Sequence, residues 1–214
     1  SDGDACTSND SCSAGRCVAT DDVCNSERLV FAVEVGQTLG GVAVADEDLV
    51  RYDPVTQKYA LYFDGSDVGL VNTGLANVAF LGNGELVMSF TSGVNLPGLV
   101  GGPAGTAVEI RDLVRFTPTT LGQTTSGTFT FYFDGSDVGL TLSAEALDAL
   151  AILPDGSLVV STTGSLSVIG VIALAQDLVR FTPTRLGAQT AGTWSMYLDV
   201  SDVGVQVLHG AVDS

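Results

Sequence analysis

Short apolar runs alternate with turn residues along most of the chain. Each run is rich in Val, Leu and Phe and is bounded by Gly, Asp or Pro; examples are "LVFAV" from Leu29, "LVMSF" from Leu86 and "LVVST" from Leu158. Runs this short, with many β-branched and aromatic residues, predict strands rather than helices. Asn83-Gly84 and Asp155-Gly156 follow apolar runs and are typical of tight hairpin turns. The pattern therefore predicts an all-β protein.

Two motifs occur three times each. "DLVR" begins at Asp48, Asp112 and Asp177, and an aromatic residue follows each copy. "FDGSDVGL" occupies 63–70, returns unchanged at 133–140, and recurs in altered form as "LDVSDVGV" at 198–205. One full unit contains four apolar runs separated by turn residues, which predicts a four-stranded antiparallel meander.

An apolar run ending in "PDG", then "SLVVS", then "DLVRFTP", is similar to the blades of NHL- and WD-repeat β-propellers. This resemblance covers roughly residues 29–210 and implies three four-stranded antiparallel repeats with pseudo-threefold arrangement. It also implies that a C-terminal strand at 205–210 closes the ring, because the first repeat lacks its first strand. Three repeats are few for a ring, so a six-bladed pair of chains, a longer array and a β-trefoil remain alternatives. The aspartate motif also resembles repeats of secreted bacterial proteins.

We expect two parts, a Cys-rich segment over 1–27 and a repeat domain over 28–214. The repeats cover about 28–74, 75–140 and 146–204 and are named repeats 1, 2 and 3 below. The Cys-rich segment is similar in spacing to dickkopf- and EGF-like modules. Its even cysteine count predicts two disulfides, for which we favour the interleaved pairing over the two alternatives and over a zinc site. The cysteines are Cys6, Cys12, Cys17 and Cys24, paired as Cys6–Cys17 and Cys12–Cys24.

Disulfides indicate an oxidising compartment, and the sequence contains no apolar run long enough to span a membrane. We therefore expect a mature secreted or cell-surface protein without a transmembrane segment. The formal net charge of −17, from 25 acidic and 8 basic residues, argues against nucleic acid as a partner because the phosphate backbone is also negative.

The repeated "DGSDVG" segments suggest two roles for their aspartates. If the three turns face one end of the molecule, their carboxylates form an acidic face that could bind Ca²⁺, which prefers oxygen ligands. The candidate metal ligands are Asp64, Asp67, Asp134, Asp137, Asp199 and Asp202. The alternative is structural, because Asp-Gly is favourable turn chemistry and an aspartate can pair with an arginine. The residues expected in structural salt bridges are Arg51, Arg115, Arg180, Asp48, Asp112 and Asp177.

The segments between the second and third strands of repeats 2 and 3 are long and apolar. We expect them to pack over the ends of the sheets or to form an assembly surface. Catalysis is less expected, because His209 is the only histidine and no nucleophile motif occurs. The sequence favours a non-enzymatic structural or interaction module that binds a protein partner or itself. The one candidate cofactor is Ca²⁺, and the alternative is that no cofactor is bound. The alternative is a carbohydrate-binding protein or glycoside-active enzyme that uses the acidic face.

Overall fold

The computed structural model describes residues 29–71 and 73–203, together with the backbone of four short strands near the N-terminus. Those four strands are paired as two antiparallel ladders, β1 with β4 and β2 with β3. Their bounds are Thr7–Ser8 for β1, Ser11–Ser13 for β2, Arg16–Val18 for β3 and Asp21–Asp22 for β4. The cysteine side chains, and with them the expected disulfides, lie outside the described residues, as does the expected closing strand at 205–210.

Three antiparallel sheets follow one another along the chain, and this confirms the all-β class. Repeat 1 contributes three strands in the order β5-β8-β9, and repeats 2 and 3 contribute four each, β10-β11-β14-β15 and β16-β17-β20-β21. Their bounds are Leu29–Phe31 (β5), Leu49–Asp53 (β8), Lys58–Phe63 (β9), Leu75–Phe80 (β10), Leu86–Phe90 (β11), Leu113–Thr120 (β14), Ser126–Phe133 (β15), Leu147–Ile152 (β16), Leu158–Thr162 (β17), Leu178–Arg185 (β20) and Ala191–Leu198 (β21).

A small two-stranded hairpin is inserted between the second and third strand positions of every repeat. The strands are Gln37–Leu39 (β6) with Val42–Val44 (β7), Val94–Asn95 (β12) with Ala107–Val108 (β13), and Leu166–Val168 (β18) with Val171–Ala173 (β19). The apolar segments noted in the sequence are therefore partly packed. Leu96 and Val108 are buried in one core cluster, and Leu166 and Val171 in another.

The hydrophobic core lies mainly between successive sheets. One cluster joins Phe63 and Leu70 of repeat 1 to Phe90 and Phe116 of repeat 2, and the next joins Phe133 of repeat 2 to repeat 3. Burial of several phenylalanines at each junction supplies the main driving force for stacking the repeats. Strands β10 and β16 are also in contact, and the Asn77 amide nitrogen donates to the carbonyl oxygen of Leu147 at 3.0 Å.

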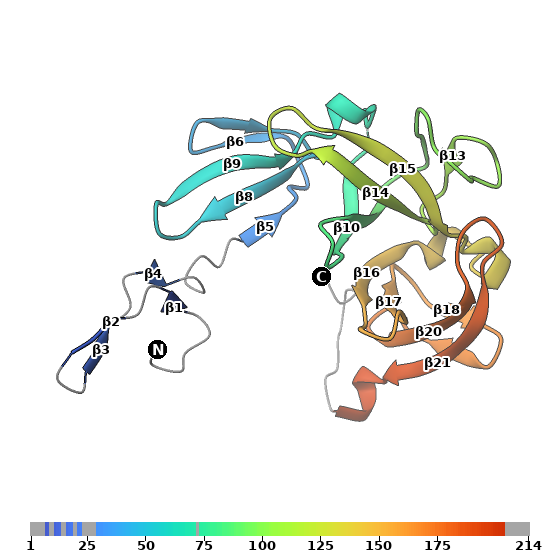
Figure 1. The fold of residues 1–214 in the computed structure, drawn as a ribbon. Helices are drawn as coiled ribbons and strands as arrows, with labels where there is room; N and C mark the ends of the chain where they lie inside the picture. Colours follow the sequence, from blue (N-terminus) through green and yellow to red (C-terminus); the bar gives the residue numbers. More distant parts are fainter. Residues whose placement is uncertain are drawn as a thin grey trace.

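The sheets form a curved row, with repeat 1 at one end and repeat 3 at the other (Figure 1). The long β14–β15 hairpin reaches back over the end of β9, which belongs to the preceding repeat (Figure 1). Among the described residues no closed propeller or barrel is formed.

Candidate functional site

Each repeat contains an aspartate loop that follows its last strand, at 64–70, 134–140 and 199–205. The described parts of these loops contain short 3-10 helices, Ser66–Val68, Ser136–Val138 and Val200–Val203. Gly69 and Gly139 end the first two helices with φ of +87° and +99°, a left-handed conformation that favours glycine. The repeated sequence thus specifies a repeated turn geometry.

The first aspartate of each loop stabilises its own turn. The serine two residues later donates its hydroxyl to this carboxylate, at 2.7 Å for Ser66 to Asp64, 2.7 Å for Ser136 to Asp134 and 2.6 Å for Ser201 to Asp199. These are the side-chain turns that Asp and Ser form readily. One candidate metal ligand in each loop, and thus three of the six, therefore has a structural role.

The aspartate of each "DLVR" motif joins two loops of its repeat. In repeat 2 the Asp112 carboxylate accepts the backbone amides of Glu109 at 2.8 Å and Gly135 at 3.2 Å. The same pair of bonds recurs in the other repeats, from Ala45 and Gly65 to Asp48 and from Leu174 and Val200 to Asp177. All three aspartates are buried, and each fixes its aspartate loop to the segment before the third strand position.

The salt bridges expected from the sequence form with other partners. Arg115 pairs with Glu85 at 3.8 Å, and Arg180 pairs with Asp155. The aspartate and arginine of one "DLVR" motif are three residues apart in or beside a strand, so their side chains point to opposite faces. Arg51 occupies the equivalent register position in β8, opposite Val30 and Ala60.

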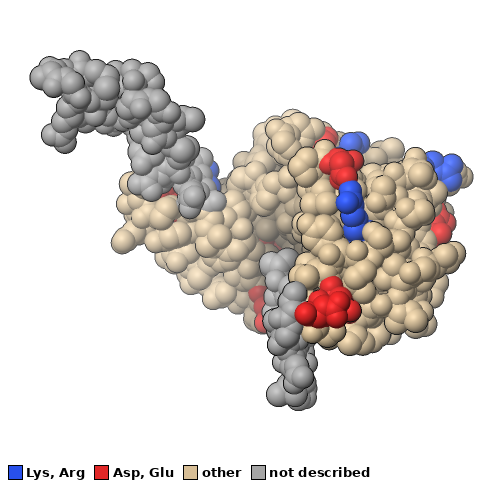
Figure 2. All heavy atoms as spheres, turned by 90° about the horizontal axis from the view of Figure 1, so that it is seen from below, with Lys and Arg blue, Asp and Glu red and all other residues tan. Residues whose placement is uncertain are grey.

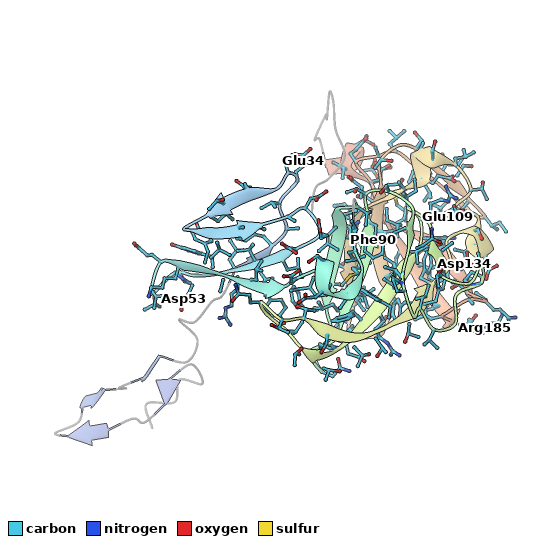
Figure 3. All side chains as sticks on the ribbon, turned by 90° about the horizontal axis from the view of Figure 1, so that it is seen from above. Glu34, Asp53, Phe90, Glu109, Asp134 and Arg185 are labelled. Atoms are coloured by element: carbon cyan, nitrogen blue, oxygen red, sulfur yellow. The ribbon has the colours of Figure 1, made fainter. Side chains whose placement is uncertain are left out.

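Burial raises the pKa of Asp112 to about 6, although the amides that donate to it act in the opposite direction; Asp134 and Glu109 add smaller upward contributions. Figure 3 shows Glu109 and Asp134 on the same side of the molecule. Burial likewise raises the pKa of Asp48. Burial in the folded protein thus favours the neutral form of both carboxyl groups more than water does.

We expect stability to depend on pH through Asp112. Its folded pKa of about 6 lies above the ordinary value of 3.8. The stabilisation it contributes is therefore fully present below about pH 4 and is lost as the pH rises through about 6. The loss should be at most about 3 kcal/mol in the free energy of unfolding. Urea unfolding between pH 4 and 7 measures it, with Asp112→Asn as the non-titrating control; identical pH profiles for both chains would contradict the assignment.

Successive repeats are held together by a hairpin clamp that the sequence analysis missed. Residues 121–125 ("LGQTT") of repeat 2 lie against β9 and the aspartate loop of repeat 1. The Gly122 amide donates to the Tyr62 carbonyl oxygen at 2.8 Å, and the Asp64 amide donates to Thr125 Oγ1 at 2.9 Å. The Thr125 amide in turn donates to Asp67 Oδ2 at 2.8 Å, so Asp67 also has a structural role.

The clamp recurs between repeats 2 and 3. Residues 186–190 ("LGAQT") place the Gly187 amide 2.7 Å from the Tyr132 carbonyl oxygen, and the Asp134 amide donates to Thr190 Oγ1 at 2.8 Å. The Trp194 indole also donates to the Val138 carbonyl oxygen at 2.9 Å. The repeated "LG" followed by a threonine was the sequence signal for these contacts, and it is missing from repeat 1.

Each aspartate loop follows its own sheet along the curved row. In Figure 1 the loop after β9 lies at the top of the view and the loop after β21 lies at the bottom. Within the described ranges, no three acidic, histidine or cysteine side chains lie close enough together to hold a metal ion. The three loops are therefore spread along the curved row in this view, and the expected single acidic face stays a prediction. Calcium binding by an individual loop stays a prediction, as does glycoside chemistry.

A groove of about 850 Å³ lies beside β5, where repeat 1 lacks the strand that corresponds to β10 and β16. It is lined by Val30, Phe31, Leu75, Phe90 and Leu147, and the acidic residues Asp46 and Asp148 also border it. Figure 3 shows Phe90 in the interior, between the ends of the row.

The two most exposed large apolar side chains lie on repeat 3. Ile169 is 95% exposed and Ile172 is 79% exposed in the β18–β19 hairpin, and β19 contacts β21. We define the apolar face of repeat 3 by its exposed members, which are Ile169, Ile172, Leu174, Met196, Tyr197 and Leu198. Figure 2 shows that one side of the molecule carries few charged side chains despite the large net charge. Large apolar side chains exposed together are typical of interaction surfaces.

Comparison with known proteins gives no family. No protein-family model and no curated protein matches the chain. Two solved structures of the extracellular domain of BT4673 from B. thetaiotaomicron, described as a one component system and as a hybrid two component system, share 13% and 14% identity with it. The matches cover 71% of this chain, with TM-scores of 0.29 and 0.31.

The chain spans about a fifth of the length of those two domains, 21% and 20%. Both TM-scores are too low to transfer a site or a function. No helix in the described part of the chain is long and apolar enough to cross a membrane.

Proposed function

We propose that the chain is a non-enzymatic interaction module of a secreted or cell-surface protein, in which stacked β-repeats present the apolar face of repeat 3 to a protein partner or to another copy. The observation that carries this proposal is the exposure of Ile169 and Ile172 at 95% and 79%. Exposure of Ile169 in the hairpin turn and of Ile172 in β19 to water is unfavourable, so burial of these side chains in an interface favours association.

The aspartates support the same proposal in a different way. The buried "DLVR" carboxylates and the first aspartate of each loop accept hydrogen bonds from the repeat itself. Groups occupied in this way hold a scaffold rigid, and a rigid scaffold lowers the entropic cost of binding through a neighbouring surface.

Sedimentation velocity over a concentration series tests the proposal. We expect reversible association of the unmodified chain at concentrations on the order of 10–100 µM, weakened at least about tenfold by the double substitution Ile169→Ser and Ile172→Ser. The matched control replaces Val55, which is exposed in repeat 1, by Ser and should leave association unchanged. A chain that stays monomeric throughout the series would contradict self-association through this face.

A further inference from the structure

The two clamps within the chain define which atoms an incoming hairpin uses. In both, the carbonyl oxygen of the tyrosine before the aspartate loop accepts a glycine amide, and the first aspartate amide donates to a threonine hydroxyl. The phenylalanine between them forms a parallel bridge with that glycine, Phe63 with Gly122 and Phe133 with Gly187. It also packs edge-on against a phenylalanine of the next repeat, Phe116 or Phe181.

Repeat 3 has the same three clamp-binding groups, one acceptor, one donor and one apolar side chain, without an incoming hairpin of the described residues. The equivalent positions are the Tyr197 carbonyl oxygen, the Leu198 side chain and the Asp199 amide. Leu198 is 37% exposed, whereas Phe63 and Phe133 are 0% and 1% exposed. The loop still keeps its fold, because Ser201 donates to Asp199 and the Val200 amide donates to Asp177 as in the other copies. No hairpin of the described residues reaches these three groups.

Repeat 1 differs at the opposite end of the row. Its hairpin, residues 53–58, is about half as long as 117–128 and 182–193, which occupy the same place in repeats 2 and 3. Asp53 Oδ1 closes this short turn by accepting the amides of Val55 and Thr56 at 2.9 and 3.1 Å. Figure 3 places Asp53 and Arg185, which lie in the hairpins of repeats 1 and 3, at opposite ends of the molecule. Repeat 1 therefore lacks a clamp hairpin. Repeat 3 has the groups that bind such a hairpin, but no described hairpin contacts them.

We propose that β21 and the start of the third aspartate loop bind the Leu-Gly-x-x-Thr hairpin of a further repeat of the same kind. The hairpin's glycine amide donates to the Tyr197 carbonyl oxygen, its threonine hydroxyl accepts the Asp199 amide, and its leucine and aromatic side chains cover Leu198. The two described hairpins of this kind, at 121–125 and 186–190, are already engaged within the chain, so the hairpin that binds here belongs to a further repeat. This inference rests on the proposed interaction function and names one site and one kind of partner for it.

Grafting a hairpin onto repeat 1 creates such a partner from the chain itself. In the graft, residues 53–58 are replaced by the sequence of residues 117–128, on a full-length chain that also carries Ile169→Ser and Ile172→Ser. This background removes association through Ile169 and Ile172, so association that remains comes through the grafted hairpin, and its failure is distinguishable from failure of the isoleucine test. We expect concentration-dependent head-to-tail oligomers in sedimentation velocity, with an apparent dissociation constant on the order of 10–100 µM.

Two controls make the result specific. The graft with valine at the position taken from Thr125, and the graft with Leu198→Glu, should each weaken association at least about tenfold. A folded graft that stays monomeric, or that associates equally well with Leu198→Glu, overturns the proposal. If the graft does not fold, a disulfide-closed peptide with the sequence of residues 116–129 is titrated into the unmodified chain. NMR shifts at the amides of Tyr197, Leu198 and Asp199 support the proposal, and unchanged shifts there overturn it.

Discussion

Replacing Phe133 by alanine is expected to lower the free energy of unfolding by about 3–5 kcal/mol. Phe133 is fully buried at the junction of repeats 2 and 3, where its ring packs edge-on against Phe181 at 5.3 Å and Trp194 at 6.4 Å between centroids. Alanine leaves a cavity between two sheets whose positions are also fixed by the clamp, so the junction cannot collapse to fill it. Urea unfolding followed by circular dichroism measures the effect.

Leu198 provides a matched control for this substitution. It occupies the same position in repeat 3 but is 37% exposed, and no hairpin of the described residues covers it. Leu198→Ala should therefore cost less than about 1 kcal/mol. Equal losses for the two substitutions would mean that the outer side of repeat 3 is covered in solution.

Replacing Asp112 by alanine is expected to cost about 3 kcal/mol at pH 4, where its stabilisation is fully present, because the part-buried amide of Glu109 and the buried amide of Gly135 lose their acceptor. Asn at this position keeps one acceptor oxygen and should lose about half as much. Asp137, which is exposed in the neighbouring loop, is the control, and its change to alanine should cost less than about 0.5 kcal/mol. A loss below about 0.5 kcal/mol for Asp112→Ala, measured by urea unfolding, would show that the carboxylate does not brace the loop.

Much of the local structure could be predicted from the sequence. The apolar runs from Leu86 and Leu158 form central strands, and Asn83-Gly84 and Asp155-Gly156 lie in the turns before them. These features depend on neighbouring residues, because a strand and its hairpin turn need only local alternation and a glycine in the correct place. The shared pattern of the three repeats was visible for the same reason.

The partners of the polar groups could not be predicted in the same way. The Asp64 amide donates a hydrogen bond to Thr125, which lies 61 residues further along the chain. The Asp134 amide likewise donates to Thr190, 56 residues further along. Such bonds depend on how two sheets stack, which the local pattern does not specify. The sequence therefore identified the aspartates as important but suggested a common acidic face. In the structure these aspartates form hydrogen bonds within and between repeats.

The short hairpin of repeat 1 is visible in the sequence. Its "DPVTQK" lacks the Leu-Gly and threonine found at 121–125 and 186–190. In a stacked array a terminal repeat differs from internal repeats because it contacts one neighbour instead of two. A comparison of the hairpins, in addition to the aspartate motif, would have predicted the direction of the row.

Site-resolved hydrogen exchange most directly tests whether the repeats form a row that is clamped at two junctions and open at repeat 3. The measurement compares three equivalent amides, those of Asp64, Asp134 and Asp199. The first two donate to threonines of the following repeat, and the third lies on the open side. Slow exchange at Asp64 and Asp134 with exchange at Asp199 faster by at least about a hundredfold is the predicted result. Similar protection at all three amides would contradict the open end, and fast exchange at all three would contradict the clamps.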